Sequence, residues 1–409
     1  MRFDYDYVIV GGGMAADAAA RGIRELDATG SIAILGDDAE PPYERPPLSK
    51  DLWREPDGAE PFLDTAAATG AQVHTSTRVT AVRRAQRVVV ANDDDEYGYR
   101  ALLLATGGRP RELNLGPSRE VVYFRTLGDY HRARALTGGP VIVVGGGFLG
   151  TEIAAGLATA GAAVTLLTPD AEIGAGAYPP GVVRRIRAAF DQHGVQVVTR
   201  ARARWLERPA AGRVAVHAGT DDHPMAFAAA GVVLALGIEV NAELARAAGL
   251  VVDDTGVRVD QHLRTLDPFV FAAGDIVDYP DVRLGRRRVE HVDHAQSSGA
   301  CAGRAMAATL TGGELPVYDH TPFFWSDIFD LGYEAVGRLD ASMQLVEDWA
   351  PGREDEHGIV YYVKDEGLQG VLLWDVYGKV DEASALLDEL HEAGSLPDPE
   401  SLRGRIALD

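Results

Sequence analysis

The sequence predicts an α/β protein with two domains built on the same strand–turn–helix plan and a smaller α+β domain at the C-terminal end. Three observations lead to this fold class. The chain has 409 residues, which is more than a single hydrophobic core usually organises. An apolar strand, a glycine-rich turn and a helix follow one another twice, beginning at Tyr7 and at Val141. From about residue 320 the pattern changes to paired strands and one helix.

The first repeat begins close to the start of the chain. Tyr7–Val10 is predicted as a buried strand and Gly11–Gly13 as a turn. A helix is expected over about Ala15–Leu26 and a second strand at Ile32–Leu35. Strands that alternate with helices indicate a parallel sheet covered on both faces.

The second repeat has the same order of elements. Val141–Val144 is the predicted strand, Gly145–Gly147 the turn, and a helix begins at Phe148. The next strand is predicted at Ala163–Leu167. The two repeats therefore predict two sheets of similar construction.

The segments between and after these repeats have a different spacing. Val88–Ala91 and Ala101–Ala105 are predicted strands around a polar turn at Asn92–Glu96, as in an antiparallel meander inserted into the first domain. After about residue 240 the alternation of strand and helix returns, with a buried strand at Pro268–Ala273.

The C-terminal part is predicted to be a small α+β domain starting near His320. Gly358–Val363 and Gln369–Trp374 flank a turn at Asp365–Gly367, which indicates a β-hairpin. A helix is expected from about Lys379 to Ala393.

The first glycine turn has the pattern Gly11-x-Gly13-x-x-Ala16. Gly11 allows the tight turn, Gly13 allows the backbone to approach a pyrophosphate, and Ala16 allows close packing of helix and sheet. The second strand of such a unit should end in an acid that binds ribose hydroxyls, and Asp37 stands at that place.

The second turn repeats the pattern as Gly145-x-Gly147-x-x-Gly150, with Asp170 at the matching distance and Glu172 close to it. Two Rossmann-like signatures, each between a strand and a helix, predict two bound dinucleotides. A flavin dinucleotide and a nicotinamide dinucleotide that exchange a hydride explain such a pair most simply. An acid at residue 170 would repel a 2′-phosphate and favours NADH.

Composition excludes several classes of function. A net charge of −22, from 39 basic and 61 acidic residues, repels nucleic acid and anionic lipid, so neither is expected as a partner. No apolar run reaches membrane-spanning length, and no leader-like segment precedes the first strand. We therefore expect a cytoplasmic location.

The cysteine content excludes further kinds of site, because Cys301 is the only cysteine. One thiol excludes an internal disulfide, a Cys-x-x-Cys metal site and a dithiol active site. Cys301 lies in an alanine-rich helical stretch and is predicted to be buried. His291 and His294 have no carboxylate-rich cluster at ligand spacing, so no metal is expected.

Several motifs resemble a known family. Asp6–Gly13, Ala105–Gly108 and Ala273–Asp275 resemble the glutathione-reductase-like flavoproteins. Tyr43–Lys50 narrows the resemblance to the branch that holds ferredoxin and rubredoxin reductases and apoptosis-inducing factor. Two later stretches look most like apoptosis-inducing factor: Leu284–His291, and Phe324–Asp327 followed by Gly332–Ala335.

The resemblance implies FAD in the first domain and NADH in the second. It implies a FAD-binding domain at 1–113 and 241–319, an NADH-binding domain at 114–240 and a C-terminal domain at 320–409. It also places Phe148 over the flavin, with Trp325 and His291 near the nicotinamide end. The resemblance implies FAD contacts from Asp37, Arg45, Lys50, Arg111 and Asp275, and Thr106, Gly107 and Gly274 of the shared motifs are also expected to bind FAD.

One part of the family pattern does not carry over. Between Trp349 and Gly358 the chain has only a short polar link, where mitochondrial apoptosis-inducing factor has a long regulatory insertion. Redox-controlled release of a long loop, and a role in cell death, are therefore not expected here.

Lys50 and Glu152 are predicted to form an ion pair that shapes hydride transfer. Lys50 is the only lysine before Lys364 in an arginine-rich chain, and a compact ammonium differs from a planar guanidinium. Glu152 lies one helical turn after Phe148, so the two side chains share a face. The alternative is that both are surface charges.

The leading functional interpretation is an NADH:acceptor oxidoreductase that passes electrons to a carrier such as a ferredoxin or rubredoxin. A second is an NADH-sensing flavoprotein that forms a long-lived charge-transfer complex and dimerises. A third is a flavin enzyme acting on a small organic or quinone substrate. Arg286–Arg288 is interpreted either as a solvated strand end or as a local docking patch for an acidic carrier.

Overall fold

The computed structural model describes residues 1–55, 58, 61–220, 222–365, 367–394, 396 and 398–408. Its contacts divide the chain into two compact units. The first unit comprises Met1–Arg45, Ala59–Arg109 and Glu239–Pro322. The second comprises Pro46–Gly58, Pro110–Ile238 and Phe323–Asp409. The chain thus enters the second unit three times.

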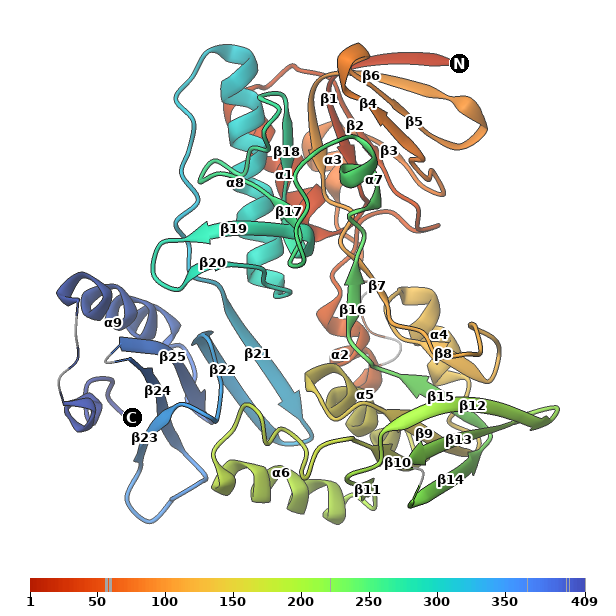
Figure 1. Ribbon diagram of the computed structural model, residues 1–409, viewed down its shortest axis with the longest axis vertical. Helices are drawn as coiled ribbons and strands as arrows, with labels where there is room; N and C mark the ends of the chain where they lie inside the picture. The colour runs from red at the N-terminus through yellow and green to blue at the C-terminus, as the bar shows by residue number, and fades with distance from the viewer. Residues whose placement is uncertain are drawn as a thin grey trace. The chain divides into compact units, whose positions relative to one another are not determined.

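The first unit is built on a mostly parallel sheet in the order β3-β2-β1-β6-β5-β4, with β18 paired to β6 (Figure 1). Tyr7 of β1 lies between Ile32 of β2 and Ala101 of β6, both in parallel register. The strands are β1 (Arg2–Val10), β2 (Ile32–Leu35), β3 (Gln72–His74), β4 (Ala81–Arg83), β5 (Val88–Val90), β6 (Glu96–Leu104) and β18 (Val270–Ala272).

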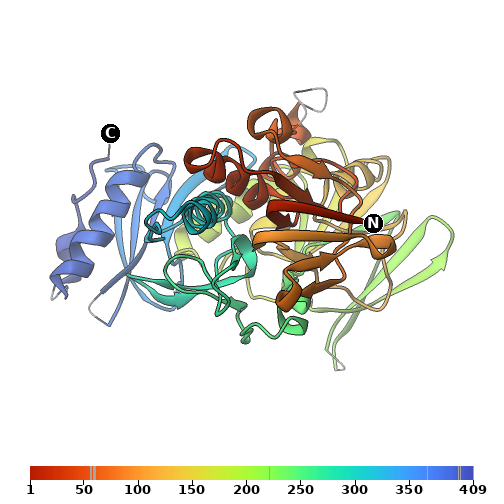
Figure 2. The same cartoon turned by 90° about the horizontal axis from the view of Figure 1, so that it is seen from above.

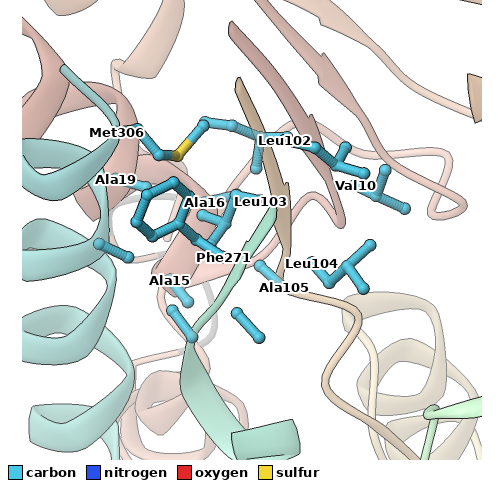
Figure 3. Packing of buried hydrophobic residues seen from close by; sticks show 14 of the residues in the cluster. Val10, Ala15, Ala16, Ala19, Leu102, Leu103, Leu104, Ala105, Phe271 and Met306 are labelled. Carbon is cyan, nitrogen blue, oxygen red and sulfur yellow. The ribbon is translucent and has the colours of Figure 1, made fainter. Parts of the chain in front are cut away.

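Two helices of the first unit, α1 (Met14–Leu26) and α8 (Val292–Thr311), pack side by side. Figure 2 shows α8 nearly end-on beside α1. Small residues allow this approach, because a Cβ on Gly303 would lie 2.1 Å from the Ala19 carbonyl oxygen. Under the helices lies a continuous apolar core, in which Figure 3 shows Phe271 and Met306 among alanines and leucines of α1 and β6.

The second unit contains the other parallel sheet, in the order β11-β10-β9-β15-β8. Val143 of β9 lies between Leu166 of β10 and Val233 of β15. The elements are β8 (Val121–Tyr123), α4 (Leu127–Arg134), β9 (Pro140–Val144), α5 (Phe148–Thr159), β10 (Ala163–Leu167), α6 (Pro180–Gln192), β11 (Gln196–Val198) and β15 (Gly231–Leu234), with an antiparallel sheet of β12 (Ala203–Ala210), β13 (Arg213–Gly219) and β14 (Pro224–Ala229).

The C-terminal segment of this unit forms an antiparallel sheet in the order β21-β22-β25-β24-β23, against which α9 packs (Figure 1). The predicted hairpin is confirmed as β24 and β25, although Glu366 of its turn lies outside the described residues. The elements are β21 (Phe323–Ile328), β22 (Leu331–Gly337), β23 (Gln344–Trp349), β24 (Gly358–Lys364), β25 (Gly367–Trp374) and α9 (Val380–Ala393).

Short elements complete the described chain. They are α2 (Asp51–Arg54), α3 (Thr65–Thr69), α7 (Glu243–Ala247), β7 (Gly108–Pro110), β16 (Ile238–Val240), β17 (Val257–Arg258), β19 (Val277–Asp281) and β20 (Gly285–Arg287), and the 3-10 turns η1 (Pro46–Leu48), η2 (Arg84–Gln86), η3 (Asn92–Asp94), η4 (Gly274–Ile276) and η5 (Pro399–Leu402).

The predicted fold class is confirmed, since each glycine turn joins a parallel strand to a helix. Strands β2 and β10 have the predicted bounds. Strand β1 is longer than predicted, because Arg2–Tyr5 also pairs with β6 while its side chains lie at the surface. An apolar run marks only the buried half of such a strand.

Candidate functional site

The first glycine turn has the geometry that a dinucleotide phosphate requires. Gly11 has φ +121°, and a Cβ there would lie 2.1 Å from the carbonyl oxygen of Ala105. At Gly13 a Cβ would meet no protein atom within 4 Å, so this side of the turn is open. Gly13 is the N-cap of α1, with no side chain bonded to the helix end. The N–H groups of α1 can therefore bind a phosphate.

The second turn is built in the same way. Gly145 has φ +123°, and a Cβ there would lie 2.2 Å from the carbonyl oxygen of Ala235. A Cβ on Gly150 would lie 1.9 Å from the carbonyl oxygen of Gly145, which shows how closely helix and turn approach. Gly147 is again open, with no atom within 4 Å. Both turns thus fit the group that the sequence predicted for them.

Thr106 and Gly274 help to fix the loops around the first turn. The Thr106 hydroxyl donates to the carbonyl oxygen of Asn241 at 2.7 Å, and the Asn241 amide donates back to the Thr106 carbonyl at 2.9 Å. The Gly274 N–H donates to Ser298 Oγ at 3.0 Å. Asp275 follows in η4, half-buried. Asn241 and Ser298 were not predicted, since neither belongs to a recognisable motif.

Asp37 stands after β2, as predicted, and its carboxylate is paired. It accepts from Arg78 Nε at 3.0 Å and from Arg78 Nη2 at 2.8 Å, and this contact raises the pKa of Arg78. Both side chains are well exposed, at 58% and 69%. A pair of this kind contributes about 0–1 kcal/mol, so ribose hydroxyls can compete for the same carboxylate.

Asp170 and Glu172 occupy the corresponding place after β10. The Asp170 side chain is exposed, and its N–H donates to Thr168 Oγ1 at 3.3 Å. The Asp170 carbonyl accepts from the N–H of Arg200 at 2.8 Å. Glu172 lies 3.6 Å from Arg187. Asp170 is thus held through its backbone, and its exposed carboxylate accepts one long hydrogen bond, from the Thr168 hydroxyl at 3.4 Å.

Three other predicted contacts lie on separate elements. The Arg45 guanidinium lies 5.3 Å from the centre of the Tyr43 ring. The N–H of Arg111 donates to the Gly237 carbonyl at 3.0 Å. His291 is the N-cap of α8, and burial lowers its pKa to about 4, so the imidazole is neutral at pH 7.

Lys50 and Glu152 form an ion pair in the second unit, with side chains only 8% and 7% exposed. The Lys50 ammonium contacts Glu152 Oε1. Glu152 Oε1 also accepts from the hydroxyl of Ser326 at 2.6 Å, and Glu152 Oε2 accepts from the hydroxyl of Ser49 at 2.5 Å. The carboxylate therefore has three donors, as a buried charge requires.

The segment that carries Lys50 is fixed on α5 by its own packing. Trp53 of α2 sits where a side chain on Gly156 would be, since a Cβ there would lie 2.6 Å from the indole. The indole N–H donates to the Leu48 carbonyl at 2.7 Å, and the Tyr130 hydroxyl donates to the Leu52 carbonyl at 2.7 Å. Lys50, the N-cap of α2, is thereby held against Glu152 of α5.

Phe148, the first residue of α5, is 39% exposed although it contacts an aromatic cluster. Its ring centre lies 5.4 Å from that of Phe324, 6.2 Å from Tyr178 and 6.5 Å from Tyr333. One face of the ring is thus supported while a large part of its surface remains accessible.

Trp325 lies on the other face of β21 from this cluster. Side chains alternate along a strand, so Phe324 and Ser326 share one face and Trp325, which lies between them, is on the other. The Trp325 ring instead stacks on Phe323, with centres 5.9 Å apart. Sequence reasoning selected Trp325 and missed Phe324, Ser326 and Ser49. The alternation in β21, and the position of Ser49 beside Lys50, were the available signals.

Arg286–Arg288 does not form a free basic patch. Arg286 lies 3.3 Å from Asp278, Arg287 lies 3.6 Å from Asp281, and Arg288 lies 2.7 Å from Glu290. The arginines are also partly buried, with 19–33% of their side chains exposed. Each of the three charges is therefore matched locally, which disfavours the docking patch, while Arg286 and Arg287 lie at the end of strand β20 with Arg286 exposed.

Two structural features are absent from the described residues. Within the described part of the chain, no group of three or more His, Cys, Asp or Glu side chains has the arrangement of a metal site. None of the helices in the described ranges combines the length and apolarity needed to cross a bilayer.

Two Rossmann-like folds, each with an open glycine turn, define a protein that binds two dinucleotides. A family model described as pyridine nucleotide-disulphide oxidoreductase matches residues 5–299. The chain belongs to this family and is an FAD-dependent NADH oxidoreductase.

Individual relatives narrow the comparison. The chain is 34% identical over 407 residues to the ferredoxin–NAD(+) reductase component of the anthranilate 1,2-dioxygenase system of Burkholderia cepacia, covering 97% of this chain and 96% of the relative. It is 30% identical to mitochondrial apoptosis-inducing factor 1 of Dictyostelium discoideum, covering 94% and 78%. Putidaredoxin reductase in its covalent complex with putidaredoxin superposes with a TM-score of 0.81 at 28% identity, covering 95% and 93%.

Proposed function

We propose that the chain takes electrons from NADH and delivers them to a separate iron–sulfur carrier of the ferredoxin type. The observation that carries this proposal is the single cysteine in a chain with two dinucleotide turns. Cys301 is 2% exposed, and burial raises the pKa of its thiol to about 11. Because the chain has no second thiol, electrons cannot pass to an internal disulfide, and an external acceptor is required.

The relatives support a carrier rather than another acceptor. The Burkholderia cepacia relative is a ferredoxin–NAD(+) reductase component, and the structural neighbour was solved with putidaredoxin. Rubredoxin is the alternative carrier within the same proposal. The proposal includes a cytoplasmic location, where NADH is supplied, and cell fractionation would test it.

FAD, when bound, supplies the chemistry that accepts a two-electron equivalent from NADH and releases single electrons to a carrier. In our proposal the two glycine turns bind the pyrophosphates, and Asp37 and Asp170 bind the adenosine riboses. The residues assigned to FAD are Gly11, Gly13, Ala16, Asp37, Arg45, Lys50, Thr106, Gly107, Arg111, Gly274 and Asp275, and those assigned to NADH are Gly145, Gly147, Gly150, Asp170, Glu172, His291 and Trp325.

Lys50 and Glu152 are proposed to assist the hydride transfer. The Lys50 ammonium supplies positive charge where negative charge grows during the reaction, so it stabilises the transition state more than the ground state. Glu152 holds that ammonium in place. Phe148, exposed on one side, is proposed to cover the reacting ring and to move aside for the nicotinamide.

The test is NADH-dependent reduction of a purified [2Fe–2S] ferredoxin, a rubredoxin and ferricyanide under anaerobic conditions. We expect turnover with ferredoxin, and the Cys301→Ser variant should match the parent because the thiol is not used. Reduction of ferricyanide without reduction of either protein carrier would contradict the proposal.

A second candidate is an NADH sensor, which the 30% identity to apoptosis-inducing factor 1 favours. A sensor would hold the reduced flavin and NAD⁺ together in air and would change its oligomeric state. A long-wavelength absorbance band that persists after NADH is mixed with aerobic protein, and a shift to dimer in size-exclusion chromatography, would favour this function.

A further inference from the structure

The Ser326 hydroxyl uses its proton on the Lys50–Glu152 pair and keeps its ability to accept a hydrogen bond. Ser326 Oγ donates to Glu152 Oε1 at 2.6 Å, since an ionised carboxylate has no proton to give. The serine oxygen still has lone pairs that can accept a hydrogen bond. Ser326 is 1% exposed, so bulk solvent does not reach this oxygen.

Tyr333 lies directly opposite Ser326 in the antiparallel pair β21–β22, so the two side chains lie next to each other on one face of the sheet. The Tyr333 hydroxyl in turn lies 2.7 Å from the hydroxyl of Tyr178. The hydrogen bonds run from Tyr178 to Tyr333 and from Ser326 to Glu152. Tyr178, Tyr333 and Ser326 thus form one row of buried hydroxyl side chains, here called the hydroxyl chain, which ends on Glu152.

Tyr178 brings a third segment into this chain. It lies just before α6, in the loop that follows β10 and contains Asp170. The ring occupies the space beside Gly174, where a Cβ would lie 2.4 Å from it. Burial raises the pKa of both Tyr178 and Tyr333, so both phenols keep their protons and act as neutral donors.

We propose that Tyr178, Tyr333 and Ser326 are positioning residues that orient Glu152, and through it Lys50, and that they connect the loop of Asp170 to the ion pair. The proposal rests on the function proposed for that pair. The hydroxyl chain carries no electrons and transfers no net proton. It fixes one carboxylate oxygen, so that the ammonium has a single resting position.

The kinetic test is single-turnover flavin reduction at saturating NADH. Removal of a hydrogen bond to a charged group, in Ser326→Ala, should slow reduction by about tenfold. Tyr333→Phe and Tyr178→Phe should slow reduction by smaller factors, and Ser326→Thr should restore most of the parental rate. Tyr362→Phe is the matched control. Tyr362 is a buried tyrosine whose hydroxyl donates to the Ala177 carbonyl at 2.6 Å, beside but outside the chain.

A second readout does not depend on activity. The sequence has three lysines, Lys50, Lys364 and Lys379, so protein labelled with ¹³C at the lysine Cε gives three side-chain NMR signals. Lys364→Arg and Lys379→Arg assign them. In the oxidised holoprotein, Ser326→Ala and Tyr333→Phe should move the Lys50 signal and leave the other two in place. Tyr362→Phe should move none of them.

The two readouts separate the possible failures. If Lys50 moves in Ser326→Ala and Tyr333→Phe while reduction keeps its parental rate, the positioning role stands and the function proposed for the ion pair falls. An unmoved Lys50 signal in both variants, each folded by thermal unfolding, overturns the hydroxyl chain. A Lys50 signal that moves equally in Tyr362→Phe also overturns it, because loop packing would then explain the effect.

Discussion

At the scale of single residues, burial of the Lys50–Glu152 pair has a large desolvation free energy. Taking two charges out of water costs several kcal/mol for each ion, and the mutual attraction repays this only with good additional hydrogen bonds. Ser49 and Ser326 supply such bonds. A buried pair between two side chains 102 residues apart in sequence is therefore a feature that we connect to chemistry rather than to stability.

The pair makes a quantitative prediction. Lys50→Ala should slow flavin reduction tens to hundreds of times at saturating NADH, about 2–3 kcal/mol for one positioned charge. Glu152→Ala should also slow it, and the double variant should depart from the sum of the two single effects. Lys364→Ala, which removes an exposed lysine, is the control. Additive and small single effects would show that both residues are ordinary charges.

Asp170 makes a prediction about nucleotide choice. Its exposed carboxylate can accept from two ribose hydroxyls of NADH and repels the 2′-phosphate of NADPH. Asp170→Ala should reduce the preference for NADH over NADPH, since each lost hydrogen bond to the ribose contributes about 1 kcal/mol. The measurement compares the reductive half-reaction with the two nucleotides, and Asp254→Ala, another exposed loop acid, is the control. An unchanged ratio would assign the selection to another residue.

At the scale of elements, the contact between α1 and α8 depends on glycine. A Cβ on Gly303 would lie 2.1 Å from the Ala19 carbonyl oxygen, and one on Gly299 would lie 2.4 Å from that of Ala15. Both atoms are backbone atoms of α1, which begins directly after the first glycine turn. We therefore expect the packing of these helices to affect the turn that is proposed to bind FAD.

We expect Gly303→Ala to force the helices apart and to destabilise the protein by about 1–3 kcal/mol, as overpacked cores do. Thermal unfolding of the holoprotein should show a lower Tm and earlier release of FAD. Gly138→Ala is the matched control, because a Cβ there meets no atom within 4 Å. Equal Tm values for the two variants would contradict the close approach of the helices.

The elements also show which parts of the fold and the candidate site can be predicted from the sequence alone. Both glycine turns and the strands β2 and β10 were predicted correctly, because strand, turn and helix signals are local. The docking of Trp53 on Gly156 could not be predicted, since it depends on contact between segments about a hundred residues apart. Ser326 was missed for a similar reason, because the sequence does not say which face of β21 meets Glu152.

At the scale of the whole molecule, charge and thiol content constrain the acceptor. A net charge of −22 gives poor long-range attraction to an acidic carrier, and physiological salt screens charges beyond about 8 Å. Recognition of a carrier must then depend on a local surface. The single buried thiol leaves the flavin as the only internal group that can pass electrons on.

The central claim is that NADH reduces the bound FAD and that a separate one-electron carrier then re-oxidises it. Anaerobic stopped-flow spectroscopy tests both steps, with one equivalent of NADH mixed first and oxidised [2Fe–2S] ferredoxin second. We predict rapid bleaching of the flavin band, followed by its recovery as two equivalents of ferredoxin are reduced. A flavin that bleaches with NADH but stays reduced in the presence of ferredoxin, rubredoxin or any other one-electron protein carrier would contradict the account.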